Sequence, residues 1–272
     1  MIPKIFEPAS DLATLVKCYW TLESPKGHTP QRNTIVPDGC MKMIFHYGDA
    51  YKRYTDEEDV SVLLPRCFVI GQLTKPLDVE PVGSTGTFFV CFHPYGFLPF
   101  ATMPIKDMEN TAVPLDKLFG TAGEEISQKI LMANTTSERI RFVEDFLFNR
   151  LEDENTIDDI VQSTVEMILT KNGQLSIDEL SKQNNINRRQ LVRKFSSAIG
   201  LSPKQLSKTV RLQAMLKTLL HHESTNFMDL ACQGEYFDQA HFIKDFKEFT
   251  GITPKAFYGD HLKMSLIFDS PE

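Results

Sequence analysis

Hydrophobic and polar positions follow two different periods along this chain. Up to about residue 107, short apolar or alternating runs are separated by turn residues, which is typical of β-strands. The clearest runs are 15–22, 40–47, 68–70 and 87–92. From residue 115 the apolar positions recur at three- and four-residue steps, and this spacing predicts helices. The pattern therefore predicts a β-rich part followed by a helical part.

The turn Pro37-Asp38-Gly39 separates the apolar run 34–36 from the run 40–47. Pro37 presets the turn dihedral, and Gly39 can adopt a positive φ. We therefore expect a β-hairpin here. The spacing of the strands predicts an antiparallel sandwich or barrel with flanking helices, so that the whole chain is an α+β protein of two domains.

Two helices are expected after the strands, at 124–132 and 137–151, and Ser137 is the expected N-cap of the second. A stripe of apolar residues runs along this second helix, made of Ile140, Val143, Leu147 and Leu151. The stripe fits packing against the β-rich core. It also fits a dimerisation helix, and the sequence leaves both interpretations open.

An internal repeat occupies the helical part, with an offset of 51 residues between segments 187–204 and 238–255. The matched pairs are Leu191 with Phe242, Arg193 with Lys244, Phe195 with Phe246, Gly200 with Gly251 and Pro203 with Pro254. A short helix is expected before each copy, at 176–184 and 225–233. Each copy thus has the plan helix, turn, helix, which is the plan of a helix-turn-helix unit.

Local signals support these two units, which we place at about 176–199 and 225–250. Asn187 and Asp238 can each cap the second helix of their unit with a side-chain oxygen. Pro203 suits the first turn of a helix that continues to about residue 221 and joins the units.

Charge changes the picture. The chain carries a net charge of −7, yet residues 180–222 hold nine Lys or Arg and no Asp or Glu. A basic stretch on an acidic protein points to a polyanion, most simply double-stranded DNA. Residues 1–155 hold 15 basic and 22 acidic side chains, so we place a boundary at the acidic run that follows residue 151. The expected domains are 1–153, β-rich, and 156–262, DNA-binding, followed by a tail at 263–272.

The candidate DNA contacts lie at the exposed start of each second helix, where a helix-turn-helix meets base edges. Arginine can grip guanine through two hydrogen bonds, and a small side chain can approach a thymine methyl group. Lysines at the start of the following helices are expected to anchor phosphates. The candidates are Arg188, Arg189, Gln190, Arg193, Lys194, Lys204, Gln239, Ala240, His241, Lys244 and Lys255.

Residues 157–258 resemble the DNA-binding domain of the AraC/XylS family of bacterial transcription regulators. The resemblance is carried by the RRQLVRKF run at 188–195, Gly200-Leu-Ser-Pro, Arg211-Leu and the run at 236–258. It implies two helix-turn-helix units that read neighbouring major-groove segments, with RNA polymerase and a second copy of the chain as further candidate partners. One departure is Glu235, where the family usually has glycine; Gly234 lies one residue earlier, so we expect a turn rebuilt around Gly234.

The first domain resembles a sensor domain attached to some members of this family. The matching pieces are Tyr19-Trp20, 36–39, 68–71, 92–96 and 115–120. The resemblance implies a β-rich domain, with a cupin-like barrel as one form, that binds a small-molecule effector and modulates DNA binding. The candidate effector contacts are Trp20, His46, His93 and Tyr95. Two alternatives are a cupin-type enzyme domain and a module that binds a protein.

Catalytic signals are not found in the sequence. It has no GxSxG, P-loop or GxGxxG element, and its five cysteines include no CxxC pair. We therefore expect neither an enzyme nor a cofactor nor a metal site. No apolar run reaches the length of a membrane span, and the first residues do not resemble a signal peptide, so a cytoplasmic protein is expected.

Overall fold

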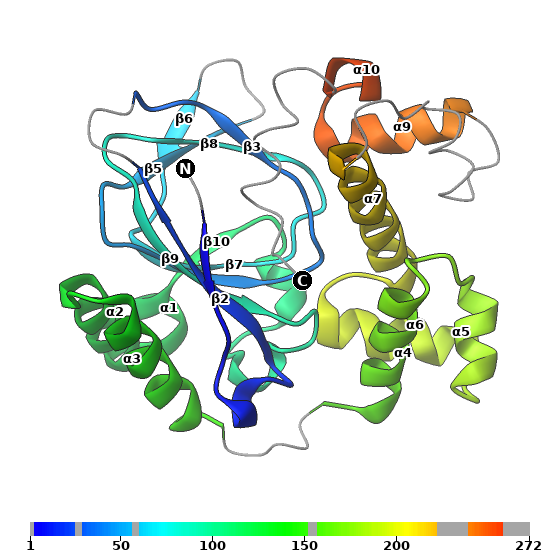
Figure 1. The fold of residues 1–272 in the computed structure, drawn as a ribbon. Coiled ribbons are helices and arrows are strands. Elements are labelled where there is room, and N and C mark those ends of the chain that lie inside the picture. Colours follow the sequence, from blue (N-terminus) through cyan, green and yellow to red (C-terminus); the bar gives the residue numbers. More distant parts are fainter. Residues whose placement is uncertain (1–2, 25–28, 56–59, 152–156, 222–238, 258–272) are drawn as a thin grey trace.

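The structure is a computed structural model of the chain, and it describes residues 3–24, 29–55, 60–151, 157–221 and 239–257. A β-rich part is followed by a helical part, as the two periods predict (Figure 1). Within the described ranges, no helix is long and apolar enough to cross a membrane.

Two antiparallel sheets form the β-rich part. The first orders its strands as β1 (Lys4–Phe6), β2 (Val16–Glu23), β9 (Gly86–Phe92), β4 (Lys42–His46), β7 (Cys67–Ile70) and β10 (Ala112–Pro114). The second orders them as β3 (Asn33–Ile35), β8 (Leu77–Pro81), β5 (Tyr51–Tyr54) and β6 (Ser61–Leu63). Among the described residues, no strand of one sheet is hydrogen-bonded to a strand of the other. Of the two expected forms, the β-rich domain is therefore a sandwich and not a closed barrel.

The centre of the six-stranded sheet is buried on both faces. Every residue of its central strands β4 and β9 is buried, which explains why their sequences read as nearly continuous apolar runs. One face packs on the four-stranded sheet through residues such as Trp20, Phe68 and Phe89. The other face packs on three helices, α1 (Leu115–Phe119), α2 (Thr121–Met132) and α3 (Thr136–Phe148). Short 3-10 turns, η1 (Ser10–Leu12), η2 (Leu98–Phe100) and η3 (Ile105–Met108), complete this part.

Helix α3 carries the apolar stripe of the sequence into the core. Val143 and Leu147 are fully buried there, and Ile140 and Leu151 pack against the same cluster. The core interpretation of the stripe is therefore confirmed. The expected N-cap, Ser137, is wrong: the cap is Thr135, because Glu138 reaches back to the amide of Thr135 and completes a capping box.

The expected hairpin around Pro37-Asp38-Gly39 is also wrong. Gly39 does adopt a positive φ of 76°, but the strands on its two sides belong to different sheets. Strand β3 pairs with β8, whereas β4 pairs with β7 and β9. The turn therefore connects the two layers of the sandwich.

Six helices form the described part of the second domain: α4 (Asp159–Thr170), α5 (Ile177–Gln183), α6 (Arg188–Ile199), α7 (Pro203–His221), α9 (Gln239–Thr250) and α10 (Pro254–Phe257). They pack around two clusters. The first joins α4, α5, α6 and the start of α7 through residues such as Leu191, Phe195 and Leu206. The second joins the later turns of α7 to α9 through residues such as Leu216 and Phe246. The linking helix is thus shared by both units.

Residues of the first domain enter both of these clusters. Tyr95 packs in the first, and Val36 packs in the second. The Cβ that a side chain at Gly200 would add lies 3.0 Å from Ile105 of η3, so the end of α6 also touches the first domain closely. The two domains are therefore packed on one another along the side of α6 and α7.

Candidate nucleic-acid interface

The first helix-turn-helix unit is built from local signals. Ser176 caps α5 in a capping box with Glu179, and Asn187 caps α6 by accepting a 2.9 Å hydrogen bond from the amide of Gln190. Between the helices, Asn185 takes a positive φ of 49°, a conformation that asparagine tolerates better than most residues. Leu180 is fully buried beneath the turn. These predicted features of the unit, namely α5, the turn, the Asn187 cap and α6, are confirmed.

Helix α6 divides sharply into a buried and an exposed face. Leu191 and Phe195 are buried, whereas Arg188, Arg189, Gln190 and Arg193 are exposed. No acidic residue lies in its first turn, so the basic side chains surround a helix N-terminus, whose free amides attract anions. Arg188 lies 3.6 Å from Asp178, a contact between two exposed groups that another anion can replace easily.

Lys194 stands apart from these arginines because it faces another helix. Its ammonium pairs with the carboxylate of Asp158, the N-cap of α4. The hydrogen bond from Lys194 holds the pKa of Asp158 below its usual value. Lys194 therefore fastens α6 to α4. Lys204, in the first turn of α7, is exposed.

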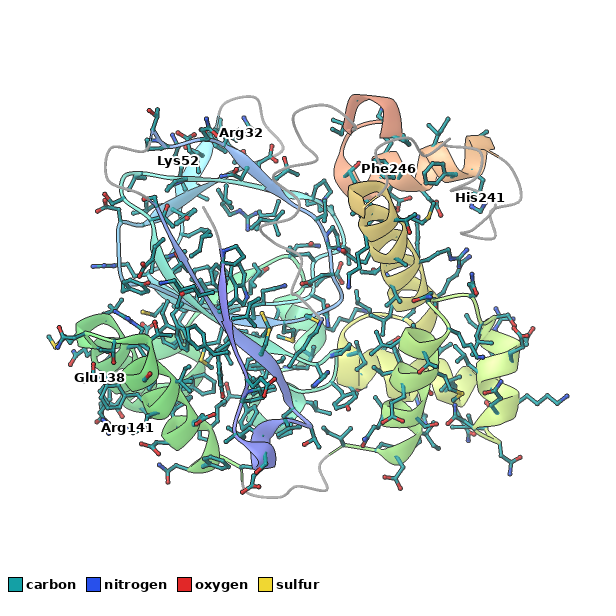
Figure 2. All side chains as sticks on the ribbon, viewed as in Figure 1. Arg32, Lys52, Glu138, Arg141, His241 and Phe246 are labelled. Carbon is teal, nitrogen blue, oxygen red and sulfur yellow. The ribbon has the colours of Figure 1, made fainter. Side chains whose placement is uncertain are left out.

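The second unit is described from α9 onward. Ala240, His241 and Lys244 are exposed on α9, whereas Phe242 and Phe246 are fully buried against α7. Figure 2 labels His241 and Phe246 on this helix. Gln239 begins α9, and Lys255 lies in the first turn of α10. The expected helix 225–233, the Gly234-Glu235 turn and the Asp238 cap lie outside the described residues.

The two reading helices lie near opposite ends of α7 (Figure 1). Leu206 of α7 packs with the first unit, and Leu212 and Leu216 pack with the second. Arg211 also donates a hydrogen bond of 3.2 Å to the carbonyl oxygen of Gly173, which follows α4. Helix α7 is therefore a rigid spacer between the two units.

Sequence reasoning missed the group that holds α9 on this spacer. Lys208 of α7 lies 2.8 Å from both Asp245 and Glu248 of α9. Burial alone would lower the pKa of Lys208, but the hydrogen bonds that its ammonium donates to these two carboxylates raise it above its usual value. The second carboxylate oxygen of Asp245 lies 3.8 Å from His241. The signal in the sequence was the pair of acids at one-turn spacing on α9, facing a lysine of the linking helix.

The four candidate effector contacts divide between two places. Trp20 and His46 line an internal cavity between the two sheets. His93 lines a cleft between the domains, together with Lys17 of β2 and Lys217 of α7. Tyr95 packs into the first helical cluster. The structure therefore brings Trp20 and His46 together and places His93 and Tyr95 at the domain boundary.

Segment 36–40 connects the sandwich to the linking helix. The carbonyl oxygen of Pro37 accepts a hydrogen bond from Gln213 of α7. Asp38 forms an ion pair with Lys42, which lines the internal cavity, and Cys40 lines both the cavity and the cleft between the domains. Segment 36–40 therefore contacts α7 and borders both the internal cavity and the cleft between the domains.

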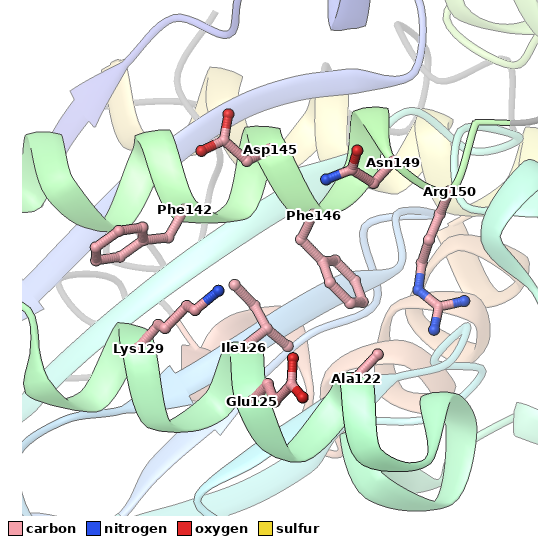
Figure 3. A pocket seen from close by; sticks show the side chains of 9 residues that line it. All are labelled: Ala122, Glu125, Ile126, Lys129, Phe142, Asp145, Phe146, Asn149 and Arg150. Carbon is pink, nitrogen blue, oxygen red and sulfur yellow. The ribbon is translucent and has the colours of Figure 1, made fainter.

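A third hollow lies on the far side of the β-rich domain, between α2 and α3 (Figure 3). Its volume is about 440 Å³, and Ile126, Phe142 and Phe146 supply an apolar wall. Lys129 and Asp145 add charges of both signs. Among the described residues, no group of three or more His, Cys, Asp or Glu side chains is arranged to hold a metal ion.

Two family models match this chain. Residues 180–259 match the model described as a helix-turn-helix domain, and residues 4–114 match a domain of unknown function, DUF6597. The chain is therefore a two-domain protein whose second domain is a helix-turn-helix domain. This domain is of the AraC type, which confirms the resemblance drawn from the arginine-rich run and the run at 236–258.

Relatives in sequence include uncharacterised HTH-type transcriptional regulators of Staphylococcus aureus strains MSSA476 and MRSA252. Each is 31% identical to this chain over 86 residues, and the match covers 32% of this chain and 11% of the relative. Only about a tenth of these longer relatives is thus represented.

Solved structures with a similar arrangement include ToxT of Vibrio cholerae, with a TM-score of 0.45 and 14% identity over 85% of this chain and 98% of that one. The AraC-like transcriptional activator CuxR has a TM-score of 0.34 and 13% identity, over 79% of this chain and 86% of that one.

Proposed function

We propose that this protein is a transcription regulator that binds double-stranded DNA through α6 and α9. The observation that carries the proposal is the exposed face at the start of α6, where Arg188 and Arg189 lie at the capped helix N-terminus and Arg193 lies one turn further along. The matching helix-turn-helix model, residues 180–259, supports it. Arg188, Arg189 and Arg193 are the proposed base contacts, with Gln190 beside them. Lys204 and Lys255 are the proposed phosphate contacts.

The second reading helix contributes differently. Ala240, His241 and Lys244 are exposed on α9, and with Gln239 they are its proposed DNA contacts. Asp245 and Glu248 lie on the same helix, so α9 adds little net positive charge. The first unit should therefore dominate the dependence of affinity on salt, while both units contribute to sequence preference.

The proposal includes control by the first domain. Its supports are the close packing of the domains and segment 36–40, which joins the cavity to α7. An effector bound in residues 1–130 would change how segment 36–40 rests on α7, and so how the two reading helices are presented to DNA. Contacts with RNA polymerase and with a second copy of the chain, and a protein in place of a small-molecule effector, stay predictions.

A gel-retardation titration tests the DNA-binding proposal. The probe is promoter DNA from the neighbourhood of the protein's own gene, measured at several salt concentrations beside an unrelated sequence. The wild-type protein should prefer the promoter, and its affinity should fall steeply with salt. Replacement of Arg188, Arg189 and Arg193 by Ala should remove the preference for the promoter. The slope of log affinity against log salt concentration should become shallower by about 0.9 for each phosphate that is no longer neutralised.

A matched control is Arg141→Ala, which removes an exposed arginine of α3 in the first domain (Figure 2). This variant should bind the promoter as the wild type does. Equal preference for the promoter in the triple variant would refute α6 as the reading helix. Equal loss in Arg141→Ala would show that the assay responds to net charge alone.

A further inference from the structure

Two cysteines of the six-stranded sheet lie directly opposite one another. Cys18 of β2 is the register partner of Cys91 of β9, beside a bulge that shifts the register of β2. Both side chains belong to the cluster between the two sheets, so they project from the same face. Directly opposed residues in an antiparallel pair have Cβ atoms about 4.5–5.5 Å apart, and a disulfide needs about 3.5–4.5 Å. A small local movement therefore brings the two sulfurs within bonding distance.

The two thiols are already joined by a hydrogen bond, and they are not equivalent. Cys91 donates to the sulfur of Cys18, and this bond, with Lys17 and Lys42 nearby, lowers the pKa of Cys18. Burial raises the pKa of Cys91 well above its usual value, and its hydrogen bond to Cys18 adds to the shift. The thiolate is the form of cysteine that attacks an oxidant. Cys18 is thus the nucleophile, and Cys91 is the thiol that stays protonated beside it.

A third thiol, Cys40, lies closer to solvent than this pair. Cys40 lines the cleft between the domains and is partly exposed, whereas Cys18 is only 5% exposed. Burial, with the nearby Asp38, raises the pKa of Cys40 to about 12, so this thiol stays protonated at neutral pH. The cleft has a volume of about 310 Å³, and its wall includes Lys17, which directly precedes Cys18. An oxidant little larger than water therefore reaches the neighbourhood of Cys18 through the cleft.

We propose that Cys18 and Cys91 form a redox modification site, which a hydroperoxide converts to a reversible disulfide across β2 and β9. The thiolate sulfur of Cys18 attacks one peroxide oxygen, the O–O bond breaks, and hydroxide leaves, so that Cys18 becomes a sulfenic acid. The sulfur of Cys91 then attacks the sulfur of Cys18. The S–S bond forms, the S–O bond breaks, and the departing hydroxyl takes the proton of Cys91 and leaves as water. The two thiols lose two electrons, and the peroxide gains them.

Trp20 lies beside this pair and reports on it. It is the only tryptophan of the chain. Its Nε1 donates a hydrogen bond of 3.0 Å to Sγ of Cys91, and its ring stacks on Phe89. A disulfide in contact with an indole ring quenches the fluorescence of that ring. Formation of the bond should therefore dim Trp20, and a reductant should restore its emission.

The test treats the full chain with hydrogen peroxide, removes the excess with catalase, and denatures the chain in N-ethylmaleimide. The reduced chain has five thiols to label, and the oxidised chain should have two fewer. Peptide mapping should join the β2 peptide to the β9 peptide, Trp20 fluorescence should fall, and dithiothreitol should reverse both changes. In Cys91→Ala the reaction should stop at the sulfenic acid of Cys18, which dimedone traps. Cys67→Ala, which alters a buried cysteine in the cluster on the other face of the sheet, should keep the disulfide.

Each remaining result contradicts the proposal. Cysteines that serve only as core packing keep all of their labels until the chain unfolds. A disulfide that maps to Cys40, or dimedone on Cys40 in place of Cys18, would refute the assignment of the pair. If Cys91→Ala fails to fold, the mapping and the fluorescence of the wild type decide, and dimming without the mapped bond refutes the proposal. Only a consequence for DNA binding rests on the proposed function, because the thiol chemistry needs no DNA. Gel retardation is a separate assay, so its failure is distinguishable from failure here.

Discussion

The side-chain amide of Gln213, on α7, donates a hydrogen bond of 2.6 Å to the carbonyl oxygen of Pro37, which lies 176 residues earlier in the chain. This bond ties the linking helix of the DNA-binding domain to the turn that connects the two layers of the sandwich. Beside it, Val36 is buried among residues of α7 and α9. The turn is therefore as much a part of the helical core as of the β-rich domain.

Replacement of Gln213 by Ala should loosen segment 36–40 without unfolding either domain. One neutral hydrogen bond contributes about 1 kcal/mol, so local opening should become about fivefold more frequent. Hydrogen exchange at the amides of Gly39 and Cys40 should rise by that factor, and exchange within α6 should not change. Gln183→Ala, which alters an exposed glutamine at the end of α5, should affect neither. Unchanged exchange at Gly39 in Gln213→Ala would refute the coupling.

Replacement of Gly39 by Ala should weaken the contact between the domains. Gly39 has a φ of 76°, and an added Cβ would lie 2.6 Å from Cδ1 of Leu206 on α7. The left-handed conformation costs about 1 kcal/mol for alanine, and the close contact adds to it. We expect a loss of about 2 kcal/mol in the free energy of unfolding, measured by denaturant titration.

Gly251 provides the matched control, because its φ is 79° and an added Cβ would meet only Cγ of Pro76, at an ordinary van der Waals distance of 3.6 Å. Gly251→Ala should cost only the backbone strain, about 1 kcal/mol. In the Leu206→Ala background, Gly39→Ala should cost no more than this strain. Equal losses from Gly39→Ala in both backgrounds would mean that Leu206 is not what the new methyl group meets.

Lys208→Met should destabilise the second unit. The substitution leaves Asp245, whose side chain is only 14% exposed, without its closest cation. A partly buried carboxylate that loses its partner costs about 1–3 kcal/mol. Lys204→Met, one turn earlier and exposed, should leave stability unchanged and should weaken promoter and unrelated DNA alike. Chemical denaturation and gel retardation together separate the two effects, and equal stability of both variants would contradict the role given to Lys208.

The sequence predicted the parts of the site whose cause is local. Asn187 caps α6, Leu191 and Phe195 turn inward, and Arg193 turns outward because helical spacing and capping act within a few residues. A local rule also failed at Ser137, where three consecutive hydroxyl residues at 135–137 competed for the cap and the position of Glu138 selected Thr135. Helix boundaries are decided by such single contacts.

The remaining features depend on partners far away in the chain. Pro37 and Gly39 have the composition of a hairpin turn, but the partner of β3 is β8, more than 40 residues away. The sequence suggested Tyr95 as an effector contact, yet its side chain packs against helices of the second domain. The strand pattern of the first domain does not predict this contact. Trp20 and His46 meet at one cavity only because β2 and β4 flank β9. No spacing within a single element carries this information.

The ion pair between Asp158 and Lys194 should make stability depend on pH in the acid range. The pKa of Asp158 is held below its usual 3.8 in the folded protein, chiefly by the hydrogen bond from Lys194. A carboxyl with a lowered folded-state pKa contributes its full stability above the unfolded pKa, and this contribution is lost as the pH falls below 3.8 through the lowered value.

Asp158→Asn keeps the oxygen that accepts from the amide of Ile160 and removes the charge. Because both side chains are more than a third exposed, the variant should lose only a few tenths of a kcal/mol at about pH 7. The difference from the wild type should shrink as the pH falls below 3.8 toward about pH 2.5. Lys194→Met should follow the same curve, while Asp158→Ala should lose about 1 kcal/mol more at both pH values because the cap is gone. Urea titrations from about pH 7 to about pH 2.5 measure this, and a constant difference between wild type and Asp158→Asn across that range would show that the pair contributes nothing through its charge.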